Sequence, residues 1–330
     1  MDKGPLKKNI AVLAGGYSDE AVISIQSATT VIENLDRDLF NPILVRIDKD
    51  RWWVDVDGSP SIDKETFTYS GGKSFDAVFI MVHGTPGEDG ILQKYFEELH
   101  LPFTTGSSES VSGTFNKFKT TSKLRDAGFK VGDSIIIDAK RAVKQSDLDL
   151  FLSTVSLPCF VKPNQGGSSL GISKVKIAEE LNSALQSARS TGCPSIIIES
   201  LLEGREFSMG IIPSKNGTPV AMPITEIVSE NEFFDYQAKY EGASEEITPA
   251  YLEENVRKAI SDAGVKAYEL LGCKGMVRID YILVDGRCPA ILEVNAVPGF
   301  SRMSILPQQL ECAGIQIKEM LSRVLNQSMK

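Results

Sequence analysis

The chain of 330 residues is longer than one hydrophobic core usually supports, so two or three domains are expected. Its net charge of −9 argues against a nucleic-acid partner, whose phosphates it would repel. No apolar run approaches the ~20 residues that a membrane helix needs, so no membrane partner is expected. The 5 cysteines are odd in number and widely spaced, which favours reduced packing residues in a cytoplasmic protein.

Apolar runs and helical spacing alternate along the first hundred residues. A helix is predicted at residues 21–35, where apolar residues recur with helical spacing. Alternating strands and helices predict a doubly wound parallel sheet, with ligand sites beyond the carboxyl ends of its strands. Gly15-Gly16 and His83-Gly84 both fall at such ends. Along the chain, strands are predicted at residues 9–14, 42–47, 52–54, 77–82, 134–137, 159–162, 196–199 and 209–212.

Turn residues and changes of pattern divide the chain into three predicted domains. They are an N-terminal α/β domain at residues 1–106, a central domain at 107–195 and a C-terminal domain at 196–330. The central domain is expected to open with a helix containing Asn116-Lys117, and one last helix is expected from Ser304 onward. Residues 229–249 lack any period and exceed an ordinary connection, which favours a functional lid.

The most informative stretch of the sequence is a predicted hairpin near the end of the chain. Two apolar runs flank Asp285-Gly286, a strong antiparallel turn signal. The hairpin would bring Asp280 beside Glu293 and Asn295, and the alternation of side chains puts Glu293 and Asn295 on one face. Three oxygen ligands on one surface suit Mg²⁺ carrying nucleotide phosphates, rather than a hairpin with scattered surface acids.

A second motif joins a strand ending in Lys162 to a loop rich in glycine and hydroxyl residues, at positions 163–171. Glycines let backbone N–H groups approach a phosphate, hydroxyls add donors, and the lysine adds charge. The lysine precedes the glycines, so this is not the P-loop of the Walker type. The segment is predicted to bind phosphate.

These motifs, in this order, resemble the D-alanine–D-alanine ligase family of ATP-grasp enzymes from Asn9 to about Ile315. The resemblance implies a three-domain α/β ATP-grasp fold, with the nucleotide bound between the central and C-terminal domains. The matching segments are Gly15 to Glu20, His83 to Gly90, Asn116-Lys117, Lys162 to Gly171, Glu199 to Glu206, Phe234 to Tyr240, and Arg278 to Gly299.

The family's functional residues carry over to matching positions of this sequence. Glu20 would bind the ammonium group of the first D-alanine, and Ser304 with the Ile305 amide would hold the carboxylate of the second. Arg278 and the backbone at Gly299 would stabilise the oxyanion. The full implied set comprises Glu20, Ser168, Tyr240, Arg278 and Gly299 for catalysis; His83, Lys239, Ser304 and Ile305 for substrate; Lys117, Lys162, Ser169, Glu199, Leu202 and Glu206 for ATP; and Asp280, Glu293 and Asn295 for two Mg²⁺ or Mn²⁺ ions.

The implied reaction joins two D-alanines through a D-alanyl phosphate formed from ATP, a step in the synthesis of peptidoglycan precursors. The resemblance also implies a homodimer. The sequence departs from the usual family pattern at several positions near the subsites. These are Ala21, Val22, Ser200, Ala296 and Phe300.

Three other interpretations remain open from the sequence. The second substrate could be D-serine or D-lactate, although Tyr240 disfavours D-lactate. A different ATP-grasp carboxylate–amine ligase is disfavoured by the Lys239-Tyr240 pair. A nucleotide-binding regulatory module without turnover is disfavoured because the acids and lysines that turnover needs are all present.

Overall fold

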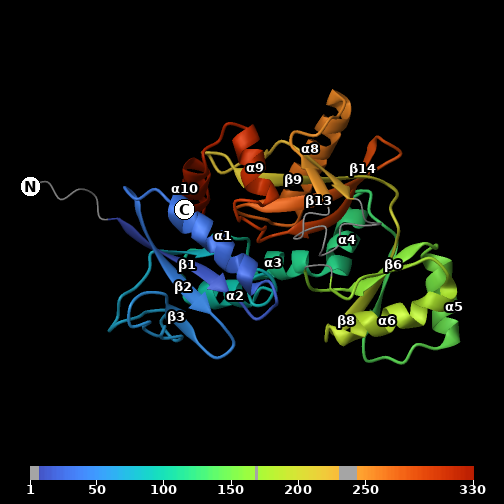
Figure 1. Cartoon of the computed structure of the whole chain (residues 1–330), viewed down its shortest axis with the longest axis horizontal. Coiled ribbons are helices and arrows are strands. Elements are labelled where there is room, and N and C mark those ends of the chain that lie inside the picture. The colour runs from blue at the N-terminus through green and yellow to red at the C-terminus, as the bar shows by residue number, and fades with distance from the viewer. Residues whose placement is uncertain (1–6, 168–169, 230–243) are drawn as a thin grey trace, which may run out of the picture.

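Three β-sheets organise the protein in a computed structural model that describes residues 7–167, 170–229 and 244–330 (Figure 1). The structure is mixed α/β, and the sheets follow one another along the chain. Within the described residues, no helix is both long and apolar enough to span a bilayer.

The N-terminal sheet is mainly parallel, as the alternation of strands and helices predicts. Its strand order is β3-β2-β1-β4, with β1 parallel to both β2 and β4 and only the edge strand β3 antiparallel. The carboxyl end of β1 leads through Gly15 and Gly16 into the first helix. The elements of this unit are β1 (Lys8–Gly15), α1 (Ala21–Asn34), β2 (Phe40–Ile47), β3 (Trp52–Val54), β4 (Ala77–Ile80) and α2 (Ile91–Glu98).

The central sheet is antiparallel, with strand order β5-β8-β6-β7. Asn116 ends one helix and caps the next, so the single helix predicted around Asn116-Lys117 is two helices. The elements are α3 (Ser108–Phe115), α4 (Lys117–Asp126), β5 (Ser134–Asp138), α5 (Gln145–Thr154), β6 (Cys159–Pro163), β7 (Ser173–Val175), the 3₁₀ helix η1 (Ala178–Glu180), α6 (Leu181–Ser190) and β8 (Ser195–Ser200).

The C-terminal sheet has six antiparallel strands in the order β12-β11-β9-β13-β14, with β10 also paired to β9. Gly314, with φ of +67°, lies in the turn that divides the single predicted last helix into α9 and α10. The elements are β9 (Gly204–Pro213), β10 (Pro219–Ala221), β11 (Thr225–Ser229), β12 (Ser244–Ile247), α8 (Glu254–Leu270), β13 (Val277–Val284), β14 (Cys288–Asn295), α9 (Ile305–Cys312) and α10 (Ile317–Ser328).

The strand pairing in the structure differs from the predicted limits of two segments. The strand expected to open the third domain, β8, hydrogen bonds with β5 and β6, so it belongs to the central sheet. We therefore propose that the second boundary follows Ser200, with the other limits left as predicted. In the predicted lid, residues 244–247 form β12, which pairs with β11. Residues 230–243 lie outside the described part of the chain.

The N-terminal and C-terminal units share one hydrophobic core, whereas the central sheet has a core of its own. Residues of β1 and α1, such as Val12 and Val31, pack in the same cluster as Leu321 and Leu325 of α10 and Phe300. Figure 1 shows α10 beside α1, which places the last helix against the first sheet. The shared core holds the first sheet against α10 and the Phe300 segment of the third unit.

Candidate active site

A cavity of about 760 Å³ lies where the three units meet. It is lined by residues of α1 and the loops after β4, by the start of α4 and the loop after β6, and by the hairpin and the start of α9. Nine of the sequence-derived candidates and the neighbouring Glu88 lie in its wall. They are Glu20, His83, Glu88, Lys117, Arg278, Glu293, Asn295, Gly299, Ser304 and Ile305.

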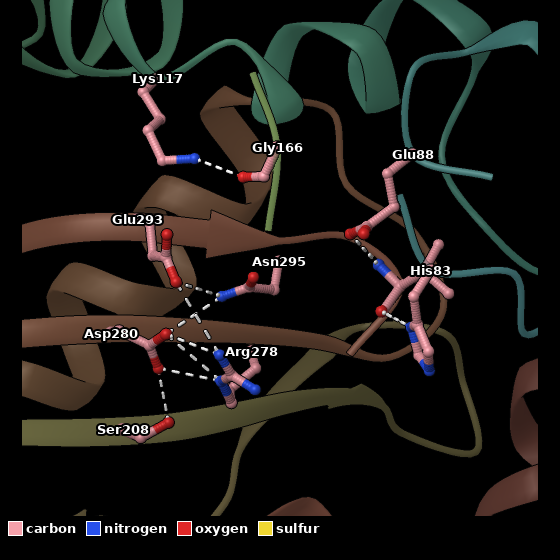
Figure 2. Close-up of polar contacts among 10 residues, drawn as sticks. His83, Glu88, Lys117, Gly166, Ser208, Arg278, Asp280, Glu293 and Asn295 are labelled. Carbon is pink, nitrogen blue, oxygen red and sulfur yellow. Dashed lines mark hydrogen bonds and ion pairs between the residues drawn. The ribbon is translucent and has the colours of Figure 1, made fainter. Parts of the chain in front are cut away.

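The hairpin forms as the sequence predicts. Asp285 and Gly286 have φ of +52° and +69° in the turn that joins β13 to β14. Asp280 is the register partner of Glu293, and Arg278 is the partner of Asn295, so these side chains gather at one end of the two strands. Figure 2 shows them converging, with Glu293 and Asn295 on β14 facing Asp280 and Arg278 on β13.

Asp280 is the best-buried member of this group and accepts hydrogen bonds from three side chains (Figure 2). Ser208 of β9 donates its hydroxyl to Oδ1 at 2.6 Å. Arg278 donates from Nε to Oδ1 at 3.0 Å and from Nη2 to Oδ2 at 2.8 Å. Asn295 donates from Nδ2 to Oδ2 at 3.1 Å. These donors offset the negative charge that two facing carboxylates concentrate at the hairpin end.

The donor set fits a magnesium ion that is held jointly by protein and nucleotide. Two carboxylates and a carboxamide are hard oxygen ligands, and Mg²⁺ usually takes one or two carboxylates plus substrate phosphates. Within the described residues, no group of three or more His, Cys, Asp or Glu side chains could hold a metal. Asp280, Glu293 and Asn295 therefore suit a metal completed by phosphate better than one enclosed by protein alone.

The loop that contains Gly299 is held by three side chains of the N-terminal unit. His83 donates from Nδ1 to the Val297 carbonyl at 2.9 Å, because a carbonyl oxygen can only accept. Its Nε2 lies 3.1 Å from the hydroxyl of Ser27, and that hydroxyl accepts the N–H of Phe300 at 3.0 Å. These contacts hold the backbone on both sides of Gly299.

Glu88 completes this support from the loop after β4. Its carboxyl accepts the Gly84 N–H at 2.9 Å and the Val297 N–H at 3.4 Å. Burial, with the negative charges of Glu20 and Glu293, raises the pKa of Glu88 to about 8, although the two N–H donors oppose the rise. Glu88 therefore holds a proton at neutral pH.

The same surroundings keep His83 neutral. Burial lowers its pKa, and the positive charge of Arg278 lowers it further, against an opposing effect from Glu20. A neutral ring with its proton on Nδ1 satisfies both neighbours, since Nε2 then accepts from Ser27. We interpret His83 as a residue that positions the Gly299 loop.

The glycine-rich loop after β6 meets both the start of α4 and Glu20. Lys117 donates from Nζ to the Gly166 carbonyl at 2.7 Å (Figure 2). A Cβ atom at Gly167 would lie 2.6 Å from Glu20 Oε2, so the backbone of the loop passes close to the Glu20 carboxylate. The buried side chain of Asn164 accepts the Phe118 N–H at 2.9 Å, which ties the loop to the first turn of α4.

The last wall of the cavity is the start of α9. Ser304 is the N-cap residue of this helix and makes no side-chain cap bond, while its hydroxyl accepts the Ser301 N–H at 3.0 Å. The first amides of a helix carry partial positive charge and bind carboxylates. Ser304 and the backbone of Ile305 therefore offer an anion site on the wall that Arg278 also lines.

Comparison with known proteins decides the family. The models named "D-ala D-ala ligase N-terminus" and "D-ala D-ala ligase C-terminus" match residues 9–73 and 124–326. This chain belongs to the D-alanine–D-alanine ligase family. The "D-alanine--D-alanine ligase" of Flavobacterium johnsoniae is 42% identical over 327 residues, which cover 98% of this chain and 99% of the relative.

Solved structures of this family have the same fold. The "VanG D-Ala:D-Ser Ligase from Enterococcus faecalis" has a TM-score of 0.86 at 26% identity, covering 98% of this chain and 100% of that one. The "D-alanine--D-Alanine Ligase from Bacillus anthracis complexed with ATP" has a TM-score of 0.79 at 26% identity, covering 98% and 97%. The ATP-grasp fold is thereby confirmed.

Several predicted ATP ligands of this family member lie away from the cavity wall. Lys162 and Glu199 are buried side by side, with Nζ of the lysine 2.5 Å from Oε2 of the glutamate. Leu202 follows β8 and Glu206 lies on β9, and neither is part of the described cavity wall. Their roles towards ATP remain predictions. Ser168, Ser169, Lys239 and Tyr240 lie outside the described residues.

The structure adds residues that the sequence reasoning missed. Ser27 and Ser208 are both fully buried hydroxyls that bond to candidate residues, and Glu246 of β12 lines the cavity. Ser208 carries a visible signal, because it is a hydroxyl within an apolar strand. Of the departures from the family pattern, Ala296 and Phe300 are buried, and Val22 is 63% exposed on α1.

Proposed function

We propose that this protein uses ATP to join two D-alanine molecules into D-alanyl-D-alanine for peptidoglycan precursors. Membership of the family and the high identity to ligases of that name support the proposal. The observation that carries it is the hairpin end, where Asp280, Glu293 and Asn295 meet Arg278 beside the cavity. The same cavity is lined by Glu20 and by the start of α9, so one space can hold a nucleotide's phosphates and two amino acids.

In the first step, the carboxylate of the first D-alanine attacks the γ-phosphorus of ATP, and ADP leaves. Activation is needed because an oxide ion is a very poor leaving group from a carboxylate. Glu20 would bind the ammonium group of this D-alanine, while Lys117 and the loop at Gly166 would approach the phosphates from the central unit. Magnesium held by Asp280, Glu293 and Asn295 would neutralise charge on the transferring phosphoryl group.

In the second step, the neutral amine of the second D-alanine attacks the carbonyl carbon of D-alanyl phosphate. The C–N bond forms, the C–O bond to phosphate breaks, and phosphate leaves with the electron pair. Arg278 and the backbone at Gly299 would stabilise the oxyanion that develops on the carbonyl oxygen. His83, Ser27 and Glu88 would keep that backbone in place.

A D-serine ligase is the second candidate, because a D-Ala:D-Ser ligase has the same fold at a TM-score of 0.86. Fold alone therefore does not choose the second substrate, and the identity to D-alanine–D-alanine ligases favours D-alanine. The deciding experiment offers D-alanine alone, and then D-alanine with D-serine, D-lactate or L-alanine, and identifies the products by mass. We expect D-alanyl-D-alanine to predominate. A mixed product that exceeds the dipeptide at equal concentrations would overturn this choice.

Two further properties belong to the same proposal. A homodimer and a cytoplasmic location are expected by analogy with the family, and all 5 cysteines are free, as in a reducing compartment. Light scattering at working concentrations measures the mass directly, and a mass near one chain of 36.0 kDa would reject the dimer. The lid over residues 229–249 is retained as a proposal for ligand-dependent closure.

A further inference from the structure

Glu246 lies in the wall of the active-site cavity, on the edge strand β12 of the C-terminal sheet. Its carboxyl is fixed by Gln308 of α9, whose Nε2 donates to Oε2 at 2.8 Å. The same Nε2 lies 3.2 Å from the carbonyl oxygen of Met303, the residue before Ser304. The Glu246 carboxylate is therefore held close to the start of α9.

Five glutamates line the cavity within the described residues, and three of them already have roles in the site. Glu20 faces the first substrate, Glu88 holds the backbone of the Gly299 loop, and Glu293 belongs to the hairpin end. Glu33 forms an ion pair with Arg302 at 2.8 Å on the outer side of the site. The reaction described above leaves Glu33 and Glu246 without a role, and Glu246 is the one held against the start of α9; the five are Glu20, Glu33, Glu88, Glu246 and Glu293.

The second amino acid needs an anionic partner in this part of the cavity. Its carboxylate is expected at the N-terminus of α9, and only one carbon separates that carboxylate from the ammonium group. A carboxylate near the start of α9 is therefore within reach of the ammonium group. Arg278 and Gln308 are the charged and polar groups that face Glu246 from β13 and α9.

We propose that Glu246 binds the ammonium group of the second amino acid and accepts its first proton. This inference rests on the proposed ligase function. The ammonium proton passes to a Glu246 oxygen, and the amine lone pair then forms the C–N bond as the C–O bond to phosphate breaks. The amide nitrogen loses its second proton to the departing phosphate or to water. Burial also raises the pKa of Glu246, which makes it a better proton acceptor than an exposed glutamate.

The structure offers a matched pair of variants for the test. Glu246→Gln keeps the size of the side chain and removes its charge. Glu245→Gln makes the same change at the neighbouring, exposed position of β12. A third variant, Gln308→Met, removes the group that holds Glu246 and leaves its charge in place.

A comparison of two nucleophiles, D-alanine and hydroxylamine, separates an effect on the second substrate from an effect on formation of the acyl phosphate. With ATP and D-alanine, hydroxylamine captures the acyl phosphate as a hydroxamate, and it is a weak base that is already neutral at pH 7. We expect Glu246→Gln to slow dipeptide formation at subsaturating D-alanine by about tenfold or more. Hydroxamate formation should stay within about twofold of the wild-type rate, Glu245→Gln should match the wild type, and Gln308→Met should lie between the two.

Each other outcome has a distinct meaning. Unchanged dipeptide formation by Glu246→Gln, or an equal loss of dipeptide and hydroxamate, would overturn the role of Glu246. Thermal melting with ATP identifies a variant that has simply unfolded, and in that case Gln308→Met carries the test through the same ratio of products. Failure of the wild-type protein to form either product would instead reject the ligase function itself.

Discussion

His83 Nδ1 lies 2.9 Å from the carbonyl oxygen of Val297, and 214 residues of sequence separate the two. The contact joins the carboxyl end of the first unit's sheet to the loop that carries Gly299. Because the ring is buried and its pKa is lowered, it acts as a neutral donor and acceptor. A substrate group that needs a charged histidine would find none here.

Replacing Ser27 by alanine tests whether this support matters to catalysis. The change leaves the Phe300 N–H and His83 Nε2 without their buried partner. We expect a loss of about 1–3 kcal/mol in the free energy of unfolding and a lower kcat, because the Gly299 backbone loses its position. Urea unfolding and steady-state rates measure the two effects.

The control for Ser27→Ala is Ser322→Ala. Ser322 donates only to the carbonyl of Lys318 within its own helix, so the variant should melt and turn over like the wild type. A Ser27→Ala enzyme with normal stability and kcat would show that the link to Phe300 is dispensable.

The raised pKa of Glu88 predicts that the stability of the folded protein depends on pH, with a defined sign. Its pKa rises from 4.5 to about 8 on folding, so the folded chain keeps a proton that the unfolded chain releases. Stability contributed by this group is therefore present below about pH 4.5 and is lost as the pH rises towards about 8. Glu88→Gln removes this titration, so the melting temperature of the variant relative to the wild type should rise between pH 5 and pH 8.

Glu98→Gln is the control for that series, because Glu98 is an exposed carboxylate at the end of α2. Its melting temperature relative to the wild type gives the variation that a surface Glu-to-Gln change produces across the same pH range. If the melting temperature of Glu88→Gln relative to the wild type varies no more with pH than that of Glu98→Gln, the folded protein does not hold an extra proton at Glu88.

Local signals in the sequence predict the hairpin well. An Asp-Gly pair between apolar runs selects a turn with positive φ, and the structure has φ of +52° at Asp285 and +69° at Gly286. The alternation of side chains then places Glu293 and Asn295 on one face, with Val294 buried between them. Neighbouring positions carry all of this information, so no knowledge of the tertiary fold is needed.

The sequence does not reveal which residues far apart in the chain come into contact. Ser27 bonds to an amide 273 residues away, and nothing in the helix around it distinguishes it from Ser24. The strand β8 is an apolar run with no local signal for one sheet over another. Its place in the central sheet comes from its hydrogen bonds with β5 and β6, which the sequence does not reveal. By contrast, the break before α10 has a local signal in Gly314, which the prediction of one helix overlooked.

Lys117 is expected to contribute to ATP affinity with little effect on the fold. Its Nζ contacts a backbone carbonyl of the glycine-rich loop and lines the cavity. A ligand that binds only the folded state stabilises it by RT ln(1 + [L]/Kd), so at a given ligand concentration the melting temperature rises more when the affinity is higher. We expect Lys117→Met to reduce the shift caused by ATP, while the melting temperature without ATP stays close to that of the wild type.

Lys119→Met provides the comparison, since Lys119 is an exposed lysine of the same helix turn. It removes the same charge from the protein without touching the loop. Equal ATP shifts in the two variants would mean that Lys117 acts only through net charge, or not at all.

The hairpin acids give the sharpest test of the metal site. Asp280→Asn and Glu293→Gln each remove one negative charge from the end of the hairpin and keep the side-chain size. We expect both to reduce ADP formation by about 10²-fold or more, because the charge on the transferring phosphoryl group loses its counterion. Asp280→Asn should also lower stability, since Arg278 loses a buried ion pair at 2.8 Å.

Asp285→Asn at the far end of the hairpin is the control and tolerates positive φ. A magnesium titration separates the two effects: Glu293→Gln should need more Mg²⁺ for half-maximal rate, with a melting temperature near that of the wild type. Turnover by either variant at the rate of Asp285→Asn would reject the metal assignment.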